Sequence, residues 1–179
     1  MNWNKWCHFD VPDKEGDNRE QVREELSKLG HCKTCTVLSG CYFVSGNTPN
    51  YPQHPHCDCL LWPIAVANHE LTAYCDVSKF TGYIFRYDKS HGKTHVFEEW
   101  GFHIGDSQYL KEELERQAKA KYASGDYTLG VLNEYGQRIT ILITLQDKKK
   151  NVRIFKTGWM VRPLGRITCN TPFSGGGVK

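Results

Sequence analysis

Hydrophobic residues recur at four-residue steps between Ser107 and Ala123, and this pattern predicts an amphipathic helix. The apolar positions are Leu110, Leu114, Ala118 and Tyr122. The other positions are mostly charged and offer favourable pairs four residues apart, Glu112 with Arg116 and Glu115 with Lys119. Gly125 can adopt the left-handed backbone conformation that ends a helix. We interpret these charges as a solvated face rather than as catalytic groups.

Two shorter helices are predicted before this one. Over residues 17–30, Asp17 or Asn18 can cap a helix that ends at Gly30. The apolar face of this helix would be Val22, Leu26 and Leu29. The other helix starts after Asp76, is anchored by Phe80, Ile84 and Phe85, and ends before the polar turn at residues 88–92.

In the last third of the chain, hydrophobic residues recur at every second position. Within residues 138–145, Ile139, Ile141, Ile143 and Leu145 alternate with polar residues, which predicts a half-buried strand. A lysine-rich turn at 146–151 leads to a second strand, 152–161, and the turn at 163–165 leads to a third, 166–171. Helices followed by an antiparallel meander predict an α+β fold.

Two tight groups of soft metal ligands, Cys32 with Cys35 and His54 to Cys59, flank a turn-rich stretch of the chain. Cys32, Cys35, Cys57 and Cys59 are our first choice for a four-thiolate zinc site. His54 or His56 can replace one thiolate, and Cys41 and His31 are further alternatives. Because four protein ligands leave no position for water, we interpret the zinc as structural. We expect this stretch to depend on the ion for its shape, since it shows little apolar periodicity.

Composition narrows the class of protein without naming a function. The 179 residues are 39% hydrophobic and 24% charged, with a net charge of +3, which permits a polyanionic partner without requiring one. The amino terminus lacks the pattern of a secretion signal, and no run has the length of a membrane span, so we expect a cytoplasmic protein without a membrane partner. We expect a Cys/His-rich region at 1–65, a second domain at 70–174 and a flexible tail at 175–179.

Two stretches of the chain resemble known families. The cysteine stretch that ends in His54-Pro-His56-Cys57-Asp58-Cys59 resembles a segment of phage minor head (Mu F-like) proteins. Residues 70–175 resemble a domain of unknown function, DUF6883, which is appended to such phage proteins and to polymorphic toxins. The resemblance rests on Lys79-Phe80, His91-Gly92-Lys93, Phe97, Gly101-Phe102, Tyr109-Leu110, Gly158-Trp-Met-Val161, Gly165-Arg-Ile167 and Asn170-Thr-Pro172.

That domain is similar to the small nucleases grouped with barnase, EndoU, the tRNA-cutting colicins and RelE (BECR). The resemblance implies helices packed on an antiparallel sheet of about four strands, whose open face binds RNA. It also implies metal-independent RNA cleavage by attack of the ribose 2′-hydroxyl in a bacterial host cytosol. Such a reaction needs a base, an acid and groups that stabilise charge on the phosphate.

The candidate catalytic residues are His91, Lys93, Thr157, Arg166 and Thr171. His91 would serve as base or acid, because an imidazole titrates near neutrality. If the segment is extended, Lys93 and His95 project to the same side as His91. Lys93 and Arg166 would hold the phosphate, while Thr157 and Thr171 would form hydrogen bonds. Glu98 is a reserve base.

Two further alternatives concern Trp159 and the class of function. Trp159 shares a face with Thr157 and would either stack a base or, in the interpretation we favour, anchor the core. The first function hypothesis is an endoribonuclease that resembles toxin domains, with RNA as substrate. The second is a non-catalytic phage accessory or inhibitor that binds a protein. An immunity protein or another phage or host protein would be the partner.

Overall fold

The computed structural model describes residues 2–7, 33–53, 55, 57 and 59–175, so the helix predicted over 17–30 lies outside the described residues. In chain order the elements are β1 (Trp3–Cys7), α2 (Lys33–Leu38), β2 (Tyr42–Val44), β3 (Leu60–Ile64), η1 (Asn68–Glu70), β4 (Thr72–Tyr74), η2 (Phe80–Ile84), α3 (Lys93–Glu99), η3 (Ile104–Asp106), α4 (Ser107–Ser124), β5 (Thr128–Asn133), β6 (Gly136–Gln146), β7 (Val152–Arg162) and β8 (Arg166–Thr171). No helix in the described ranges is long and apolar enough to cross a membrane.

The larger sheet has five strands in the order β4-β8-β7-β6-β5. Strands β6 to β8 form the predicted antiparallel meander, and β6 pairs with β7 from Arg138–Met160 to Gln146–Val152. Strand β5, which was not predicted, pairs antiparallel with β6. The expectation of about four antiparallel strands was incomplete, because β4 adds a fifth strand that runs parallel to β8. With only three residues, β4 is too short to show an alternating pattern.

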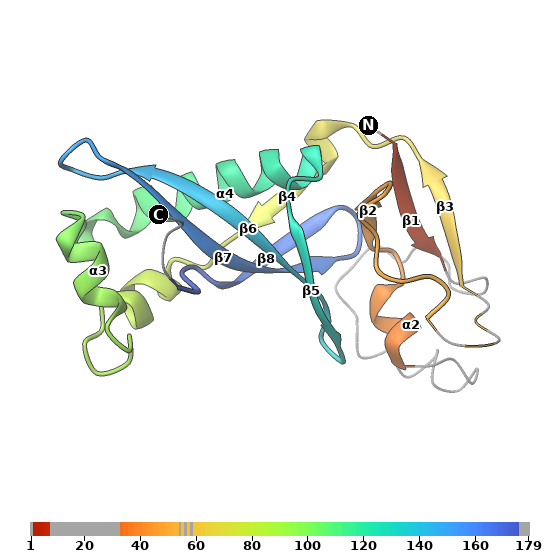
Figure 1. The fold of residues 1–179 in the computed structure, drawn as a ribbon, viewed down its shortest axis with the longest axis horizontal. Coiled ribbons are helices and arrows are strands. Elements are labelled where there is room, and N and C mark those ends of the chain that lie inside the picture. The colour runs from red at the N-terminus through yellow and green to blue at the C-terminus, as the bar shows by residue number, and fades with distance from the viewer. Residues whose placement is uncertain (1, 8–32, 54, 56, 58, 176–179) are drawn as a thin grey trace.

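Helix α4 lies along one face of this sheet (Figure 1). The predicted apolar positions Leu110, Leu114, Ala118 and Tyr122 are all buried, as are the alternating residues Ile139, Ile141, Ile143 and Leu145 of β6. The predicted ion pairs were wrong in their partners: Arg116 pairs with Glu113 and Lys111 with Glu115. Gly125 ends the helix at φ 73°, as predicted.

The first part of the chain forms a second sheet with the order β2-β1-β3. Trp6, Leu38 and Phe43 are fully buried and belong to the same core as α4 and the five-stranded sheet. The Trp3 and Tyr122 rings meet edge to face with centroids 5.3 Å apart. The expectation of too few apolar residues in this stretch was therefore wrong for the described residues, whereas its dependence on an ion stays a prediction. Its apolar side chains lie in strands of three to five residues, which are too short to show a period.

Helix α4 does not cover the opposite face of the five-stranded sheet (Figure 1), where several side chains of β6 are exposed. We call it the open face and define it by the outward positions of three strands: Arg138, Thr140, Leu142 and Thr144 of β6, Lys156 and Gly158 of β7, and Thr171 of β8. Most of these side chains are exposed or half-buried, whereas Gly158 is buried between its neighbours. The core face and the open face thus differ sharply in their contact with solvent.

Candidate functional site

Three cysteines come together beside the smaller sheet, and we call them the thiol cluster: Cys35 in α2, and Cys57 and Cys59 immediately before β3. Their Sγ atoms all lie within 4.8 Å of one another, and those of Cys35 and Cys57 are 3.5 Å apart. This separation is close to the roughly 3.8 Å between two sulfurs on a tetrahedral zinc with bonds of about 2.3 Å. The thiol cluster can therefore hold a metal ion.

The surroundings of the thiol cluster fit a bound ion. Burial acts to raise the pKa of the Cys57 thiol, but hydrogen bonds from the Cys59 backbone, the Cys35 thiol and the Gln53 backbone outweigh it and lower this pKa. Such donors stabilise thiolates, the form that binds metals. Burial raises the pKa of the Cys59 thiol, against the effect of the nearby Trp6 indole.

The Trp6 indole Nε1 is buried and has no well-aligned acceptor among the described residues. It lies beside the Cys59 thiol, where an ion-bound thiolate would accept its hydrogen. Of the predicted ligands, Cys32, His54 and His56 lie outside the described residues, as does the alternative His31. Cys41 is buried with its Sγ 3.7 Å from Val37 O and is not part of the thiol cluster.

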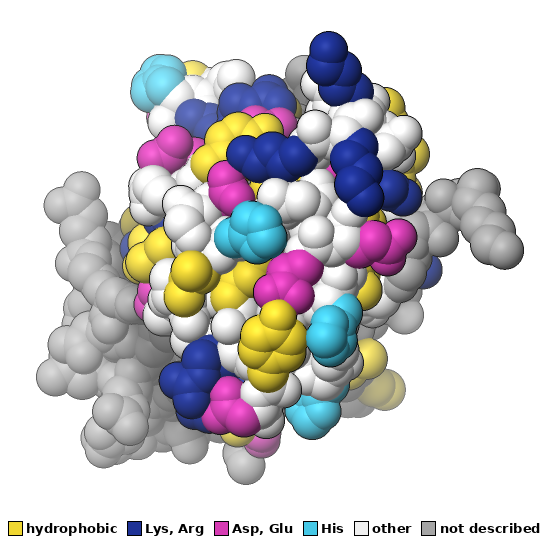
Figure 2. Space-filling model, turned by 90° about the vertical axis from the view of Figure 1, so that its left-hand side faces the viewer, with side chains coloured by type: hydrophobic (Ala, Val, Ile, Leu, Met, Phe, Trp, Pro, Cys, Tyr) yellow, Lys and Arg dark blue, Asp and Glu magenta, His cyan; other side chains and the backbone are white. Residues whose placement is uncertain are grey.

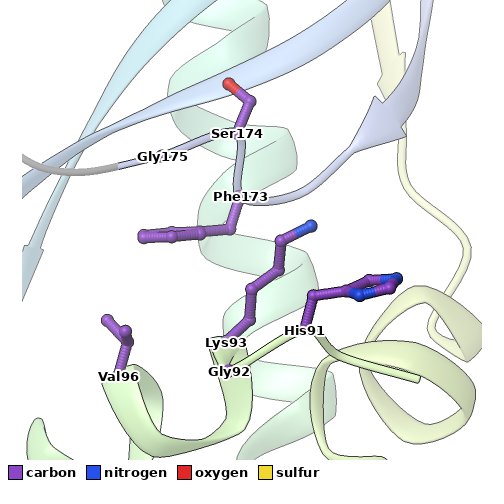
Figure 3. A pocket seen from close by; sticks show the side chains of 7 residues that line it. All are labelled: His91, Gly92, Lys93, Val96, Phe173, Ser174 and Gly175. Atoms are coloured by element: carbon purple, nitrogen blue, oxygen red, sulfur yellow. The ribbon is translucent and has the colours of Figure 1, made fainter.

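A second site lies where the start of α3 meets the chain after β8. We call it the His91 pocket, an open cavity of about 380 Å³ lined by His91, Gly92, Lys93, Val96, Phe173, Ser174 and Gly175. Figure 3 shows Lys93 reaching upward between the Phe173 ring and the His91 imidazole. The structure thus brings the predicted pair His91 and Lys93 into one site, together with residues that sequence reasoning did not select.

The turn before α3 explains how His91 is presented. His91 and Gly92 both adopt the left-handed conformation, with φ 49° and 82°, which is uncommon for a non-glycine residue. Below them, the buried Thr94 Oγ1 lies 2.6 Å from Ile84 O and 2.7 Å from Ser90 Oγ. These contacts fix the turn to the core while the imidazole stays exposed.

Tyr83 holds the Lys93 side chain in place. The Lys93 ammonium donates a hydrogen bond to the Tyr83 hydroxyl at 2.7 Å, and it lies 4.6 Å from the centre of the Tyr83 ring. Tyr83 belongs to η2, the turn of π-helix that stands where the sequence predicted a helix anchored by Phe80 and Ile84. No pattern in the sequence pointed to Tyr83, because the contact joins two helical segments.

His95 does not join the His91 pocket. The expectation that it projects beside His91 and Lys93 assumed an extended segment, but Lys93 begins a helix and residues two apart on a helix face different sides. The His95 imidazole instead lies 4.0 Å from the Glu98 carboxylate and packs edge-on against Tyr87. The Tyr87 hydroxyl donates a hydrogen bond to Glu98, which raises the pKa of Tyr87.

Thr157 is part of the core rather than of a site. Thr157 and Trp159 share a face as predicted, but both are fully buried. The Thr157 hydroxyl donates to Ile141 O and accepts from Trp159 Nε1, both at 2.8 Å. This geometry contradicts a direct catalytic role for Thr157, and it makes Trp159 a core anchor rather than a stacking platform.

Arg166 and Thr171 stand at opposite ends of β8, about 16 Å apart along an extended strand. Only Thr171 lies near the His91 pocket, two residues before Phe173. Arg138, which sequence reasoning did not select, approaches the Thr171 end of the sheet, because both side chains border Gly158. The sequence could have indicated this placement, because Arg138 alternates with the buried isoleucines of β6 and therefore points to the other face of the sheet.

The charges of the five-stranded sheet are all of one sign. Its strands contain Arg138, Arg153, Lys156, Arg162 and Arg166 but neither Asp nor Glu. Figure 2 views the end of the molecule that carries α3 and the tip of the β6–β7 hairpin. On it, Lys and Arg side chains gather in the upper part, and His side chains lie mostly below them. The modest net charge thus hides a local excess of positive charge on the sheet.

Comparison with protein families identifies a domain of unknown function (DUF6883) over residues 66–169. The match covers more than half of the chain, so the protein belongs to this family. The resemblance seen for the second part of the chain is thereby confirmed. The expected links to phage minor head proteins and to the BECR nucleases gain no support from this match. No curated protein and no solved structure matches the chain.

Proposed function

We propose that this protein binds and cleaves RNA at the His91 pocket. The observation that carries the proposal is that one open pocket combines an exposed imidazole with a positioned lysine ammonium. An imidazole can move protons near neutral pH, and an ammonium stabilises the charge that develops on a phosphate during transfer. The positively charged strands beside the pocket favour a polyanionic substrate.

The reaction would proceed by attack of a ribose 2′-oxygen on the adjacent phosphorus. The P–O bond to the leaving 5′-oxygen breaks, which leaves a 2′,3′-cyclic phosphate on one product. His91 takes the 2′-hydroxyl proton as base while water protonates the leaving 5′-oxygen, or His91 protonates the leaving oxygen as acid while water accepts the 2′-hydroxyl proton. Lys93 stabilises the phosphate charge, and Tyr83 positions Lys93. No metal takes part in this scheme.

His95 supplies a matched control, because it is an exposed histidine on α3, four residues after His91, but outside the pocket. We expect His91→Ala to abolish cleavage of a single-stranded RNA, Lys93→Ala to lower its rate by at least about a hundredfold, and His95→Ala to leave it unchanged. Circular dichroism and urea unfolding would check that each variant folds. Equal activity of wild type and His91→Ala would remove His91 from the mechanism, and inactive wild-type protein would count against the function itself.

We further propose that the thiol cluster holds a structural zinc ion with a fourth ligand from the cysteine-rich segment. Three thiols form a soft donor set that suits zinc. We expect one zinc per chain by elemental analysis, and a melting temperature that falls after chelation. Cys57→Ser should lose the ion, whereas Cys75→Ser, a change at a buried thiol outside the cluster, should retain it. Metal-free protein that melts at the same temperature with and without chelator would contradict a structural metal.

The second candidate function is binding of a protein partner without catalysis. The observation in its favour is that Leu142, Val152 and Ile154 are 38%, 65% and 37% exposed on neighbouring strands. Exposed aliphatic groups of this kind are common where proteins associate. Expression in a bacterial host separates the two functions: growth arrest relieved by His91→Ala supports the nuclease. Equal effects of both proteins on growth favour binding.

A further inference from the structure

The Arg138 guanidinium lies on the open face with no hydrogen-bonding or ion-pair partner among the described residues. It extends towards β8 across Gly158, the residue of β7 that has no side chain to obstruct it. A Cβ atom built on Gly158 would lie 3.9 Å from Arg138 Nη2 and 3.7 Å from Thr171 Oγ1. A guanidinium from β6 and a hydroxyl from β8 thus border the same small space above β7.

No carboxylate of the sheet competes for this guanidinium, because the five strands contain neither Asp nor Glu. Three other described arginines show the contrast. Arg86 forms an ion pair with Asp88 at 2.9 Å, and Arg116 forms one with Glu113 at 2.6 Å. Arg153 pairs with Asp147 at 2.9 Å. Arg138 is therefore an exposed cation with its hydrogen-bond donors still available to an outside anion.

We propose that Arg138 and Thr171 form a phosphate-binding subsite that holds a second phosphodiester of the RNA bound at the His91 pocket. The guanidinium fork matches two phosphate oxygens, and a hydroxyl can donate to a third. Gly158 contributes by leaving room for the arginine to cross the strand. Arg138 and Thr171 are positioning residues here, since neither touches the reacting atoms.

Thr171 links the subsite to the pocket along the chain. Thr171 stands two and three residues before Phe173 and Ser174, which line the pocket, a separation of roughly 7–10 Å along an extended chain. A short single strand can bridge this span. The RNA would then run across the strands, from α3 over β8 and β7 towards β6. This inference rests on the proposed function for the identity of its ligand.

The test is direct binding of an oligonucleotide that cannot be cleaved. The probe is a fluorescent octauridylate with 2′-O-methyl groups at every position, titrated with wild-type protein at several salt concentrations. We expect Arg138→Gln to weaken binding by at least about tenfold. The slope of log K against log salt should fall by about 0.7, as for the loss of one phosphate contact on a single strand. Thr171→Val should weaken binding without changing this slope, because it removes no charge.

Arg116→Gln is the matched control, since it removes a cation from the outer face of α4, on the other side of the sheet. A further arm uses a fluorescent octaglutamate peptide, which carries carboxylates in place of phosphates. The inference is overturned if wild-type protein does not bind the octauridylate, if Arg138→Gln and Arg116→Gln weaken binding equally, or if only the peptide binds. The last result would assign the open face to an acidic protein.

The same experiment separates the failure of the subsite from the failure of the proposed function. If the octauridylate binds through Arg138 but unmodified RNA is never cut, the subsite stands and the nuclease reaction fails. If RNA is cut while Arg138→Gln binds like wild type, the reaction stands and the subsite fails. Urea unfolding of each variant confirms that the altered binding does not come from a loss of folded protein.

Discussion

Replacing Thr157 by valine tests whether this residue serves the core rather than the reaction. The Thr157 hydroxyl is fully buried and accepts a hydrogen bond from Trp159 Nε1 at 2.8 Å. Among the described residues, Thr157 is the only acceptor for this indole N–H. Valine has nearly the same shape as threonine, so the change leaves no cavity. It does leave the buried indole N–H without a partner, and it removes the hydroxyl's own bond to Ile141 O.

A buried donor without a partner costs about 1–3 kcal/mol. For a domain whose free energy of unfolding is about 5–15 kcal/mol, such a loss is easily measured. With a urea m-value of about 1–3 kcal/mol/M, the midpoint of urea unfolding should fall by about 1 M while m stays constant. Fluorescence is a suitable probe, because unfolding exposes the buried Trp159.

Thr144→Val is the control for this prediction, since Thr144 lies on the open face of β6 and is exposed. We expect its free energy of unfolding to stay within about 0.5 kcal/mol of the wild-type value. The reasoning fails if Thr157→Val is equally mild, or if both variants lose the same stability. RNA cleavage by folded Thr157→Val should match that of wild type, and a selective loss of cleavage would restore Thr157 to the site.

Three further predictions concern stability. Burial acts to raise the pKa of the Asp147 carboxyl, but its hydrogen bonds lower this pKa to about 2. The stabilisation of the folded state by the ionised Asp147 is therefore present above the unfolded pKa of about 3.9 and is lost as the pH falls through 2. In Asp147→Asn, the urea midpoint should depend less on pH over this window than in wild type. Gly101→Ala should lower the midpoint markedly, because φ is 83° and the new Cβ would lie 2.7 Å from a lysine side chain, whereas Gly105→Ala, with open space, should not. Tyr122→Phe removes the hydrogen bond to Tyr42 O and should cost about 1 kcal/mol in urea unfolding; no loss would contradict the packing of β2 on α4.

The elements that sequence analysis predicted well are those whose period repeats many times. Helix α4 runs for 18 residues and β6 for 11, so the hydrophobic period repeats several times within each element. Strands of three to five residues, such as β2 and β4, offer no such repetition. Pairing with distant partners decides their structure, and single-sequence patterns do not report it.

The candidate site divides in the same way. His91 and Lys93 are two residues apart, so their proximity was predictable, although the left-handed turn and the helix that follows were not. Thr157 was misjudged because alternation shows which residues share a face but not which face is buried. Its neighbours at two-residue steps, Phe155 and Trp159, are aromatic and could have indicated the core side. The contacts of Tyr83 and Arg138 depend on tertiary structure alone.

A chimeric oligonucleotide tests the proposed reaction most directly. The probe is a DNA strand with a single ribonucleotide at its centre, compared with an all-deoxy strand of the same sequence. Wild-type protein, with chelator present, should cut only the first strand, on the 3′ side of the ribonucleotide, and should leave a 2′,3′-cyclic phosphate detectable by mass spectrometry. His91→Ala should cut neither strand. Cleavage of the all-deoxy strand, or an intact chimera after incubation with folded wild-type protein, would contradict 2′-hydroxyl attack at the His91 pocket.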